Sequence, residues 1–171
     1  MVLVRELKVK KKDIRVAIIT VSDRCSEGIA EDKSGPILRS LFEEKDYFVS
    51  SYLLLPDDEE AIKRELLKLC KEKMDLIITT GGTGFAKRDV TVEATLAVSD
   101  KLAPGISEAI RSKSLVMHPN AMLSRAVSVI HGSTLIINFP GSPSACTDAF
   151  NVIEGVLVHA IGLLRGEKMD K

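Results

Sequence analysis

The sequence has no tryptophan, and aromatic residues make up only 4% of its 171 residues. Proteins that bind single-stranded nucleic acid commonly stack bases on aromatic side chains, and this chain offers few of them. Its 24 basic residues are matched by 24 acidic residues, so the formal net charge is zero. Without an excess of positive charge, the chain lacks the field that drives non-specific binding to nucleic acids. The composition therefore predicts no nucleic-acid partner.

Cysteine is also scarce. Cys25, Cys70 and Cys146 lie far apart and form neither a C-x-x-C pair nor a Cys/His spacing typical of zinc sites. This pattern is typical of reduced thiols rather than of a disulfide framework. The sequence has no uninterrupted apolar run near the roughly 18 residues of a membrane helix, and no signal-peptide core at its N-terminus. We therefore expect a cytoplasmic protein that does not contact a membrane.

The length of the chain predicts a single domain. A chain of 171 residues can bury a substantial core, yet it is short for two independent domains. The first twelve residues contain five basic side chains, which we interpret as a solvated basic arm over residues 1–13. These side chains are Arg5, Lys8, Lys10, Lys11 and Lys12. The domain is then expected over residues 14–171.

The first half of the chain alternates between strand and helix patterns. Continuous runs of β-branched and other apolar residues predict strands, and apolar residues at helical spacing predict helices. The predicted strands are 14–21, 47–55 and 75–80, and the predicted helices lie around 36–42, 57–74 and 91–101. Strands that alternate with helices in this way are typical of a doubly wound α/β fold.

The second half of the chain ends the regular alternation. Apolar positions from 104 to 117 again predict a helix, whereas residues 126–130 and 134–139 resemble two strands of a hairpin. A final amphipathic helix is predicted over 147–165, with Gly166 just past its end. The hairpin would add an antiparallel strand at the edge of an otherwise parallel sheet.

Polar and glycine-rich sequences follow the predicted strands. Open α/β sheets bind ligands beyond the carboxyl ends of their strands. The sequences at these ends are Ser22–Asp23, 56–58, the GGTG of 81–84 with Arg88–Asp89, and the PGSP of 140–143. We expect these sequences to converge on one site.

The GGTG stretch has two interpretations. Gly81, Gly82 and Gly84 can adopt positive φ angles and turn their backbone N–H groups toward a phosphate. The same glycines would also suit a plain tight turn. The stretch is not a Walker A loop, because no Lys-Ser/Thr pair follows, and it is not the G-x-G-x-x-G pattern, because Lys87 stands at the third glycine position. The residues alone favour neither the anion cradle nor the turn.

Asp57 and Asp89 also have two interpretations. Each precedes a predicted helix, where an aspartate commonly caps backbone N–H groups, and Asp57 with Glu60 matches the spacing of a capping box. Two carboxylates at neighbouring strand ends can also hold Mg²⁺ together with substrate phosphates. The two roles are compatible, because a capping carboxylate keeps free lone pairs. The three histidines, by contrast, share no spacing that predicts a catalytic or metal site.

In their order and spacing, these stretches resemble the molybdopterin adenylyltransferase family, which includes MogA, MoaB and the G domains of gephyrin and of plant molybdenum-cofactor proteins. The resemblance extends from Arg15 to Arg165. The matching stretches are TVSDRCSEG with EDKSGP, LPDD, TTGGTGFAKRDVTVEAT, APGISEAIR, MLSRAV and TLIINFPGSP. The chain departs from the family pattern where Lys87 and Val92 replace prolines and where no lysine follows PGSP.

This resemblance implies a three-layer α/β/α fold, commonly trimeric, that transfers AMP from ATP to the terminal phosphate of molybdopterin and releases pyrophosphate. The family needs Mg²⁺, and the acidic residues on which its activity depends match Asp57 and Asp89, which are the expected catalytic and metal-binding residues. The residues expected to bind pterin and nucleotide are Ser22, Asp23, Gly81, Gly82, Thr83, Gly84, Pro140, Gly141 and Ser142. A molybdate-insertion enzyme is an expected partner.

Two other interpretations stay open within the same fold. One is a MoaB-like paralogue that binds pterin or nucleotide without catalysis, although the presence of both Asp57 and Asp89 favours an enzyme. The other is a trimeric scaffold module, as in gephyrin, for which a chain of this length offers no second domain to assemble.

Overall fold

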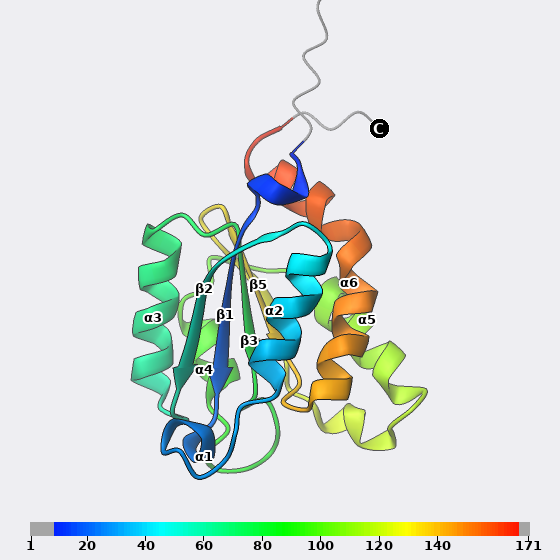
Figure 1. Cartoon of the computed structure of the whole chain (residues 1–171). Helices are drawn as coiled ribbons and strands as arrows, with labels where there is room; N and C mark the ends of the chain where they lie inside the picture. Colours follow the sequence, from blue (N-terminus) through cyan, green and yellow to red (C-terminus); the bar gives the residue numbers. More distant parts are fainter. Residues whose placement is uncertain (1–8, 168–171) are drawn as a thin grey trace, which may run out of the picture.

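The apolar runs of the sequence form the strands of a six-stranded sheet that lies between two layers of helices (Figure 1). The computed structural model describes residues 9–167. The strands are β1 (Arg15–Val21), β2 (Phe48–Leu55), β3 (Leu76–Thr80), β4 (Lys101–Leu102), β5 (Ser128–His131) and β6 (Thr134–Phe139). The helices are α1 (Asp23–Ser26), α2 (Ser34–Glu44), α3 (Glu59–Lys71), α4 (Thr91–Ala97), α5 (Pro104–Leu115) and α6 (Pro143–Leu164), with 3₁₀ turns η1 (Lys11–Asp13) and η2 (Pro119–Leu123).

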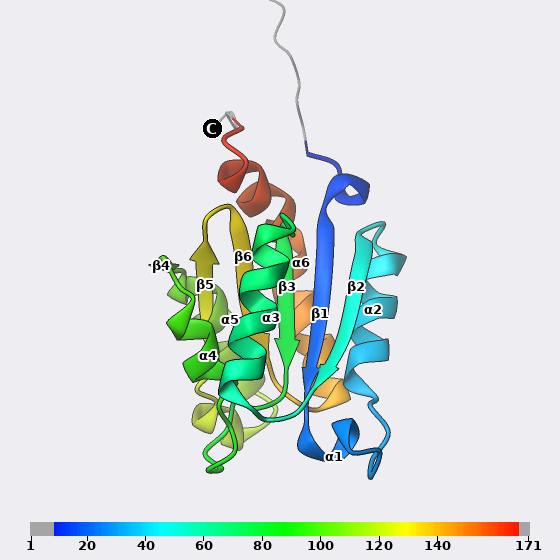
Figure 2. The same ribbon diagram turned by 90° about the vertical axis from the view of Figure 1, so that its left-hand side faces the viewer.

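The sheet has the strand order β2-β1-β3-β6-β5-β4, as Figure 2 shows from the side of α3 and α4. Strands β2, β1, β3 and β6 are parallel, whereas β5 is antiparallel to both β6 and β4. Every residue of β3 and β6 is buried, because helices cover both faces of a sheet whose crossovers are helical. The predicted three-layer α/β/α fold with an antiparallel edge is therefore confirmed.

Two hydrophobic cores hold the layers together. On one face, Ile18 and Ile78 of the sheet pack with Phe42 of α2 and Phe150 of α6. On the other face, a second cluster joins the sheet to α3 and α4. Its residues include Ile19, Ile77, Ile136, Leu66 and Ala94. The alternation of side chains along each strand supplies both cores at once.

Helix boundaries differ from the sequence-based predictions in several places, and the helix predicted over 57–74 spans Glu59–Lys71. The helix predicted over 91–101 ends at Ala97, because Lys101 and Leu102 pair with β5 and the N–H of Asp100 donates to the carbonyl of Ile130. Pairing with the sheet overrides local helix propensity there. The last helix begins at Pro143 instead of residue 147, and the short helix α1 was not predicted. The hairpin was predicted correctly, and Gly166 has the positive φ of +77° expected just past a helix.

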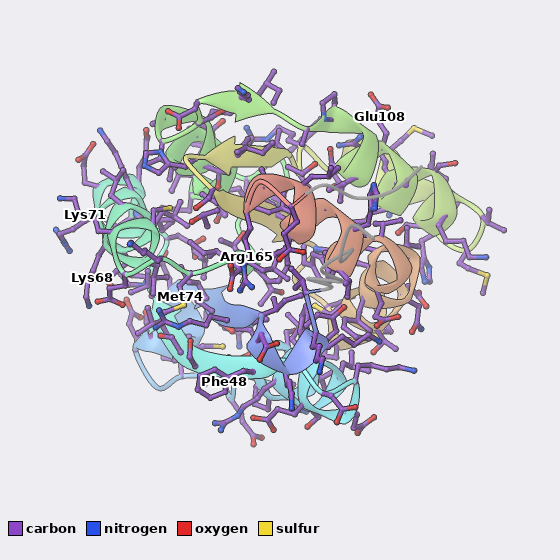
Figure 3. The ribbon with its side chains drawn as sticks, turned by 90° about the horizontal axis from the view of Figure 1, so that it is seen from above. Phe48, Lys68, Lys71, Met74, Glu108 and Arg165 are labelled. Atoms are coloured by element: carbon purple, nitrogen blue, oxygen red, sulfur yellow. The ribbon has the colours of Figure 1, made fainter. Side chains whose placement is uncertain are left out.

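An ion pair closes the amino end of the sheet. Arg165, just past α6, donates two hydrogen bonds of 2.8 Å to the carboxylate of Asp75 and one of 2.7 Å to the carbonyl of Asp13. The same carboxylate accepts the backbone N–H of Arg15 at 2.8 Å. Seen from above in Figure 3, Arg165 lies over the middle of the molecule. This cluster ties the start of β1 and the start of β3 to the last helix.

The N-terminal segment is described from residue 9 onward. Val9 is buried, and Lys11 forms an ion pair with Glu154 of α6. Residues 1–8 of the predicted basic arm lie outside the described residues. Among residues 9–167, α6 is the one helix whose length and composition would also suit a membrane crossing, a test that core helices of soluble proteins pass as well. Its Ile153 and Leu157 are buried in the first core.

Candidate active site

The loops after β1, β3 and β6 meet at the carboxyl ends of the parallel strands, at the lower end of Figure 1. Gly81 follows β3 with a φ of +96°, and a Cβ there would lie 2.3 Å from the carbonyl oxygen of Val21 at the end of β1. A Cβ on Gly141, which follows β6, would lie 3.4 Å from the Cα of Gly81. Because these two positions lack side chains, three strand ends can converge.

The glycine loop (residues 81–84) runs between the two predicted catalytic aspartates. Gly82 has a φ of +65°, and a Cβ on it would lie 2.1 Å from Thr91 Oγ1 and 3.2 Å from Asp57 Oδ1. A Cβ on Gly84 would lie 2.8 Å from Asp89 Oδ2. The backbone thus approaches one carboxylate at Gly82 and the other at Gly84.

Asp57 does not cap α3. Its neighbour Asp58 is the capping residue, since Asp58 Oδ1 accepts the N–H of Ala61 at 2.7 Å. Asp57 instead exchanges two hydrogen bonds with Asp23: each residue donates its backbone N–H to the other's carboxylate, at 2.9 Å in both directions. The capping interpretation of Asp57 is therefore wrong. Asp57 and Asp58 are adjacent in the sequence, and the backbone turn places Asp58 at the cap and directs Asp57 toward the loop after β1.

Asp89 does not cap α4 either. The residue before this helix is Val90, and no side chain caps it. Asp89 Oδ2 accepts the N–H of Ala86 at 2.9 Å, which closes a tight turn within residues 86–89. Within the described part of the chain, Oδ1 of Asp57 and Oδ1 of Asp89 receive no hydrogen bond. Each aspartate therefore keeps one carboxylate oxygen available to a ligand.

The glycine loop also presents free backbone donors. Among residues 9–167, the N–H groups of Gly82, Thr83 and Gly84 donate to no protein acceptor. Successive N–H groups near residues of positive φ form a concave nest that suits an anion. Of the two interpretations of GGTG, this geometry favours the anion cradle over a plain turn.

The charges around the loop are not balanced. The guanidinium of Arg88 donates two hydrogen bonds of 2.9 Å to Asp23, and these bonds lower the pKa of the Asp23 carboxyl group. The pKa of Asp57 is raised, first because this carboxyl group is partly buried and then because it lies near the charges of Asp23 and Asp89. These effects outweigh the opposing hydrogen bond from the Asp23 N–H and the charge of Arg88. Among residues 9–167, Arg88 pairs with Asp23, whereas the carboxylates of Asp57 and Asp89 form no ion pair.

Two cavities flank the segment that follows β6. The first has a volume of about 340 Å³, and the residues that line it include Thr20, Ser22, Ser34, Gly81 and Gly141. The second has a volume of about 170 Å³ and a more apolar lining, which includes Ile110, Arg111, Asn138, Pro140 and Ser142. Hydrogen bonds from Ser34 Oγ to the Gly141 carbonyl (2.8 Å) and from Thr80 Oγ1 to the Pro140 carbonyl (2.7 Å) fix the wall between them.

A family model described as a probable molybdopterin binding domain matches residues 17–159. The chain belongs to this family. It is 37% identical over 162 residues to the molybdopterin adenylyltransferase of Helicobacter pylori (strain ATCC 700392 / 26695), a match that covers 92% of this chain and 91% of that protein. It is 39% identical over 155 residues to the molybdopterin adenylyltransferase of Escherichia coli (strain K12), a match that covers 86% of this chain and 80% of that protein.

Solved structures of the family share this fold. The molybdopterin biosynthesis enzyme MoaB from Thermus thermophilus superposes with a TM-score of 0.84 and 39% sequence identity, covering 92% of this chain and 99% of that chain. The resemblance drawn from the sequence motifs is therefore confirmed at the level of family and fold.

Two arginines of this molybdopterin-binding domain have contacts at the site that the sequence did not predict. Arg88 is two-thirds exposed and holds Asp23. Arg125 contacts the backbone on both sides of the loop that carries Asp89. The MLSRAV stretch that contains Arg125 matched the family, and this match was the one signal in the sequence for its importance.

Proposed function

We propose that this protein is a molybdopterin adenylyltransferase, which transfers AMP from ATP to the terminal phosphate of molybdopterin and releases pyrophosphate. The observation that carries the proposal is the glycine loop that runs between Asp57 and Asp89, with free N–H donors on the loop and a free oxygen on each carboxylate. Phosphoryl-type transfer depends mainly on positioning and on stabilisation of charge, and this arrangement supplies both.

Two substrates require two neighbouring sites. We assign the nucleotide to the polar cavity beside Ser22, Ser34 and Gly81, with its phosphates extending from this cavity toward the N–H groups of Gly82, Thr83 and Gly84. We assign the pterin to the more apolar cavity beside Ile110. Pro140 and Ser142, from the segment that separates the two cavities, form part of its lining. The terminal phosphate of the pterin would then reach the α-phosphate of the nucleotide at the wall between the cavities.

The residues present fit Mg²⁺. This ion prefers oxygen ligands and is commonly held by one or two protein carboxylates together with substrate phosphates. Asp57 and Asp89 offer such carboxylate oxygens, and within residues 9–167 no group of three or more His, Cys, Asp or Glu side chains forms a complete protein cage. When bound, Mg²⁺ would neutralise negative charge on the phosphates of the nucleotide.

We infer direct transfer rather than a covalent enzyme intermediate, because the sequence contains no G-x-S-x-G nucleophile motif. An oxygen of the terminal pterin phosphate attacks the α-phosphorus of ATP, and the bond from that phosphorus to the β-bridging oxygen breaks to release pyrophosphate. The N–H groups of Gly82, Thr83 and Gly84 bind phosphate oxygens, and Ser142 contributes a hydroxyl at the wall of the pterin cavity. Asp23 orients Asp57 through their paired hydrogen bonds.

The test combines the purified protein with ATP, Mg²⁺ and molybdopterin and detects adenylylated pterin by mass spectrometry. We expect product with the natural sequence and none with Asp89→Ala, while the circular dichroism spectrum stays unchanged. Asp100→Ala is the matched control, since Asp100 is an exposed aspartate that hydrogen-bonds the Gly132 N–H in the turn after β5, and it should keep full activity. Absence of product under conditions where the Helicobacter pylori relative forms it would reject the proposal, as would full activity of Asp89→Ala.

The resemblance to the family also carries two proposals about assembly. We infer a cytoplasmic homotrimer that passes its product to a molybdate-insertion enzyme. Sedimentation equilibrium should give three times the mass of one chain, and a mass of one chain would reject the trimer.

A further inference from the structure

Arg125 closes the base of the loop that carries Asp89. We name residues 84–89 the aspartate loop. The guanidinium of Arg125 donates to the carbonyl of Gly84 through Nε and to the carbonyl of Asp89 through Nη2, at 2.7 Å in both cases. Its backbone N–H donates to the carbonyl of Thr83 at 2.9 Å. One residue that lies 36 positions further along the chain therefore binds both ends of the loop.

Arg125 is itself fixed from two sides. Its guanidinium forms an ion pair with Glu93 of α4, which directs it toward the loop. Its chain neighbours Ser124 and Ala126 are held by Arg111 of α5, which donates to their carbonyls at 3.1 and 2.8 Å. Arg125 therefore acts as a rigid fork, and planar guanidinium groups suit such paired contacts better than ammonium groups do.

The aspartate loop depends on this support. Phe85 is 70% exposed and Arg88 also lies at the surface, so the tip of the loop adds little buried apolar area. Inside the loop, the Ala86 N–H donates to Asp89 Oδ2 and the Asp89 N–H donates to the Ala86 carbonyl. Without Arg125, these two bonds and the exposed ion pair of Arg88 with Asp23 would be left to hold the loop, and two loop carbonyls would lose their donor.

We propose that Arg125 is a positioning residue that fixes the Asp89 carboxylate in its working geometry. The effect on catalysis rests on the proposed function, whereas the effect on the loop does not. Arg125 contacts Asp89 through the Asp89 carbonyl, whereas the Asp89 carboxylate accepts the Ala86 N–H. Its role is therefore to hold the backbone that carries the catalytic group.

The chain contains a matched control. Arg165 is a second arginine that pairs with a carboxylate and a backbone carbonyl, and its side chain has the same exposed fraction, 31%, as that of Arg125. It lies at the opposite end of the sheet, outside the site. Substitution of Arg165 should affect stability without affecting the aspartate loop.

The first experiment needs no activity. Hydrogen exchange is measured peptide by peptide on the natural protein, Arg125→Ala and Arg165→Ala, at a temperature at which all three are folded. We expect Arg125→Ala to speed exchange in residues 84–90 at least tenfold, and Arg165→Ala to leave these residues unchanged. Arg125→Lys serves where the alanine variant does not fold, and it should show a smaller increase in the same peptide. Unchanged exchange in residues 84–90 would overturn the proposal.

The second experiment measures adenylyl transfer. We expect Arg125→Ala to lower kcat by about 10- to 100-fold with KM for ATP changed less than threefold, and Arg125→Lys to restore part of the loss. Combination with Asp89→Asn should cost little beyond Asp89→Asn alone, because both changes remove the same contribution. Additive losses, or an equal loss of kcat in Arg165→Ala, would overturn the positioning role. If the natural protein forms no product, the proposed function fails and the exchange experiment still decides the role of Arg125.

Discussion

The two ends of the central sheet carry aspartates in opposite electrostatic settings. At the amino end, Asp75 is 9% exposed, and its carboxylate accepts three N–H groups, two of them from Arg165. At the carboxyl end, Asp57 and Asp89 lie beside the glycine loop, and Asp23 is hydrogen-bonded to Asp57 and pairs with Arg88. Asp75 is therefore neutralised by Arg165, whereas among residues 9–167 Asp57 and Asp89 form no ion pair.

This contrast separates stability from function. A satisfied carboxylate joins elements and contributes to the free energy of unfolding, whereas a partly buried carboxylate whose pKa is raised opposes folding at neutral pH. The pKa of Asp57 is raised chiefly by burial, and shifts of this kind cluster at functional sites.

Among changes that separate the two ends of the sheet, Asp57→Asn should have the largest effect, and this effect is on activity. Asparagine keeps an oxygen that can accept the Asp23 N–H but removes the charge, so kcat should fall about a thousandfold. The pKa of Asp57 is raised in the folded state, so at neutral pH its ionised form opposes folding, and this opposition disappears as the pH falls through the raised pKa. The free energy of unfolding of Asp57→Asn at pH 7 should therefore be equal or higher. Urea unfolding and steady-state kinetics check both expectations. A clear loss of stability in Asp57→Asn would contradict the contrast between the two ends of the sheet.

Asp75→Asn should lower the stability of the fold and leave the activity nearly unchanged, which is the opposite of what we expect for Asp57→Asn. Removal of one partner from a largely buried ion pair costs roughly 3 kcal/mol. The free energy of unfolding from urea titration should fall by about this amount, because Arg165 loses its carboxylate and β1 is less firmly tied to β3. The activity per folded molecule should stay within twofold of the natural value. A thousandfold loss of activity would show that the two ends are not independent.

Gly82→Ala should disrupt the site through shape rather than charge. The new Cβ would overlap Thr91 Oγ1 at a φ of +65°, and we expect a loss of about 2 kcal/mol in stability together with weaker ATP binding in calorimetry. Gly132→Ala is the matched control, because Gly132 has a φ of +56° with no atom within 4 Å of the added Cβ. It should cost about 1 kcal/mol and leave ATP binding intact. Equal effects of the two changes would contradict the close approach at Gly82.

The smallest expected effect is that of Arg88→Gln. The hydrogen bonds from Arg88 lower the pKa of Asp23, so the substitution should raise that pKa toward the ordinary value of 3.8, as followed by carboxyl NMR titration. A carboxyl group whose pKa is lowered by folding stabilises the fold at pH values above its pKa in the unfolded chain. This contribution is lost as the pH falls through the lower pKa of the folded protein. Because the pair is exposed, the change in the free energy of unfolding should be near the detection limit. An unchanged pKa would show that the Asp57 N–H alone holds Asp23 ionised.

Much of the fold could be read from local sequence. Continuous apolar runs such as 14–21 predict buried parallel strands because both of their faces must be covered, and β1 was found at Arg15–Val21. The helix predicted over 91–101 wrongly included Lys101, which lies in β4, because a two-residue strand carries no period of its own and is defined by its partner, β5.

The sequence by itself determined which residues gather at the site, since parallel strands must bring their carboxyl ends to one edge of the sheet. Residues 22–23, 57, 81–84, 89 and 140–142 all lie at that edge. Only the tertiary structure decided what each aspartate does. Asp58 rather than Asp57 caps α3, and Arg125 supports the loop of Asp89 from 36 residues away. The reason is physical: strand direction follows from local patterns, whereas the choice of hydrogen-bond partner depends on atoms that only folding brings together.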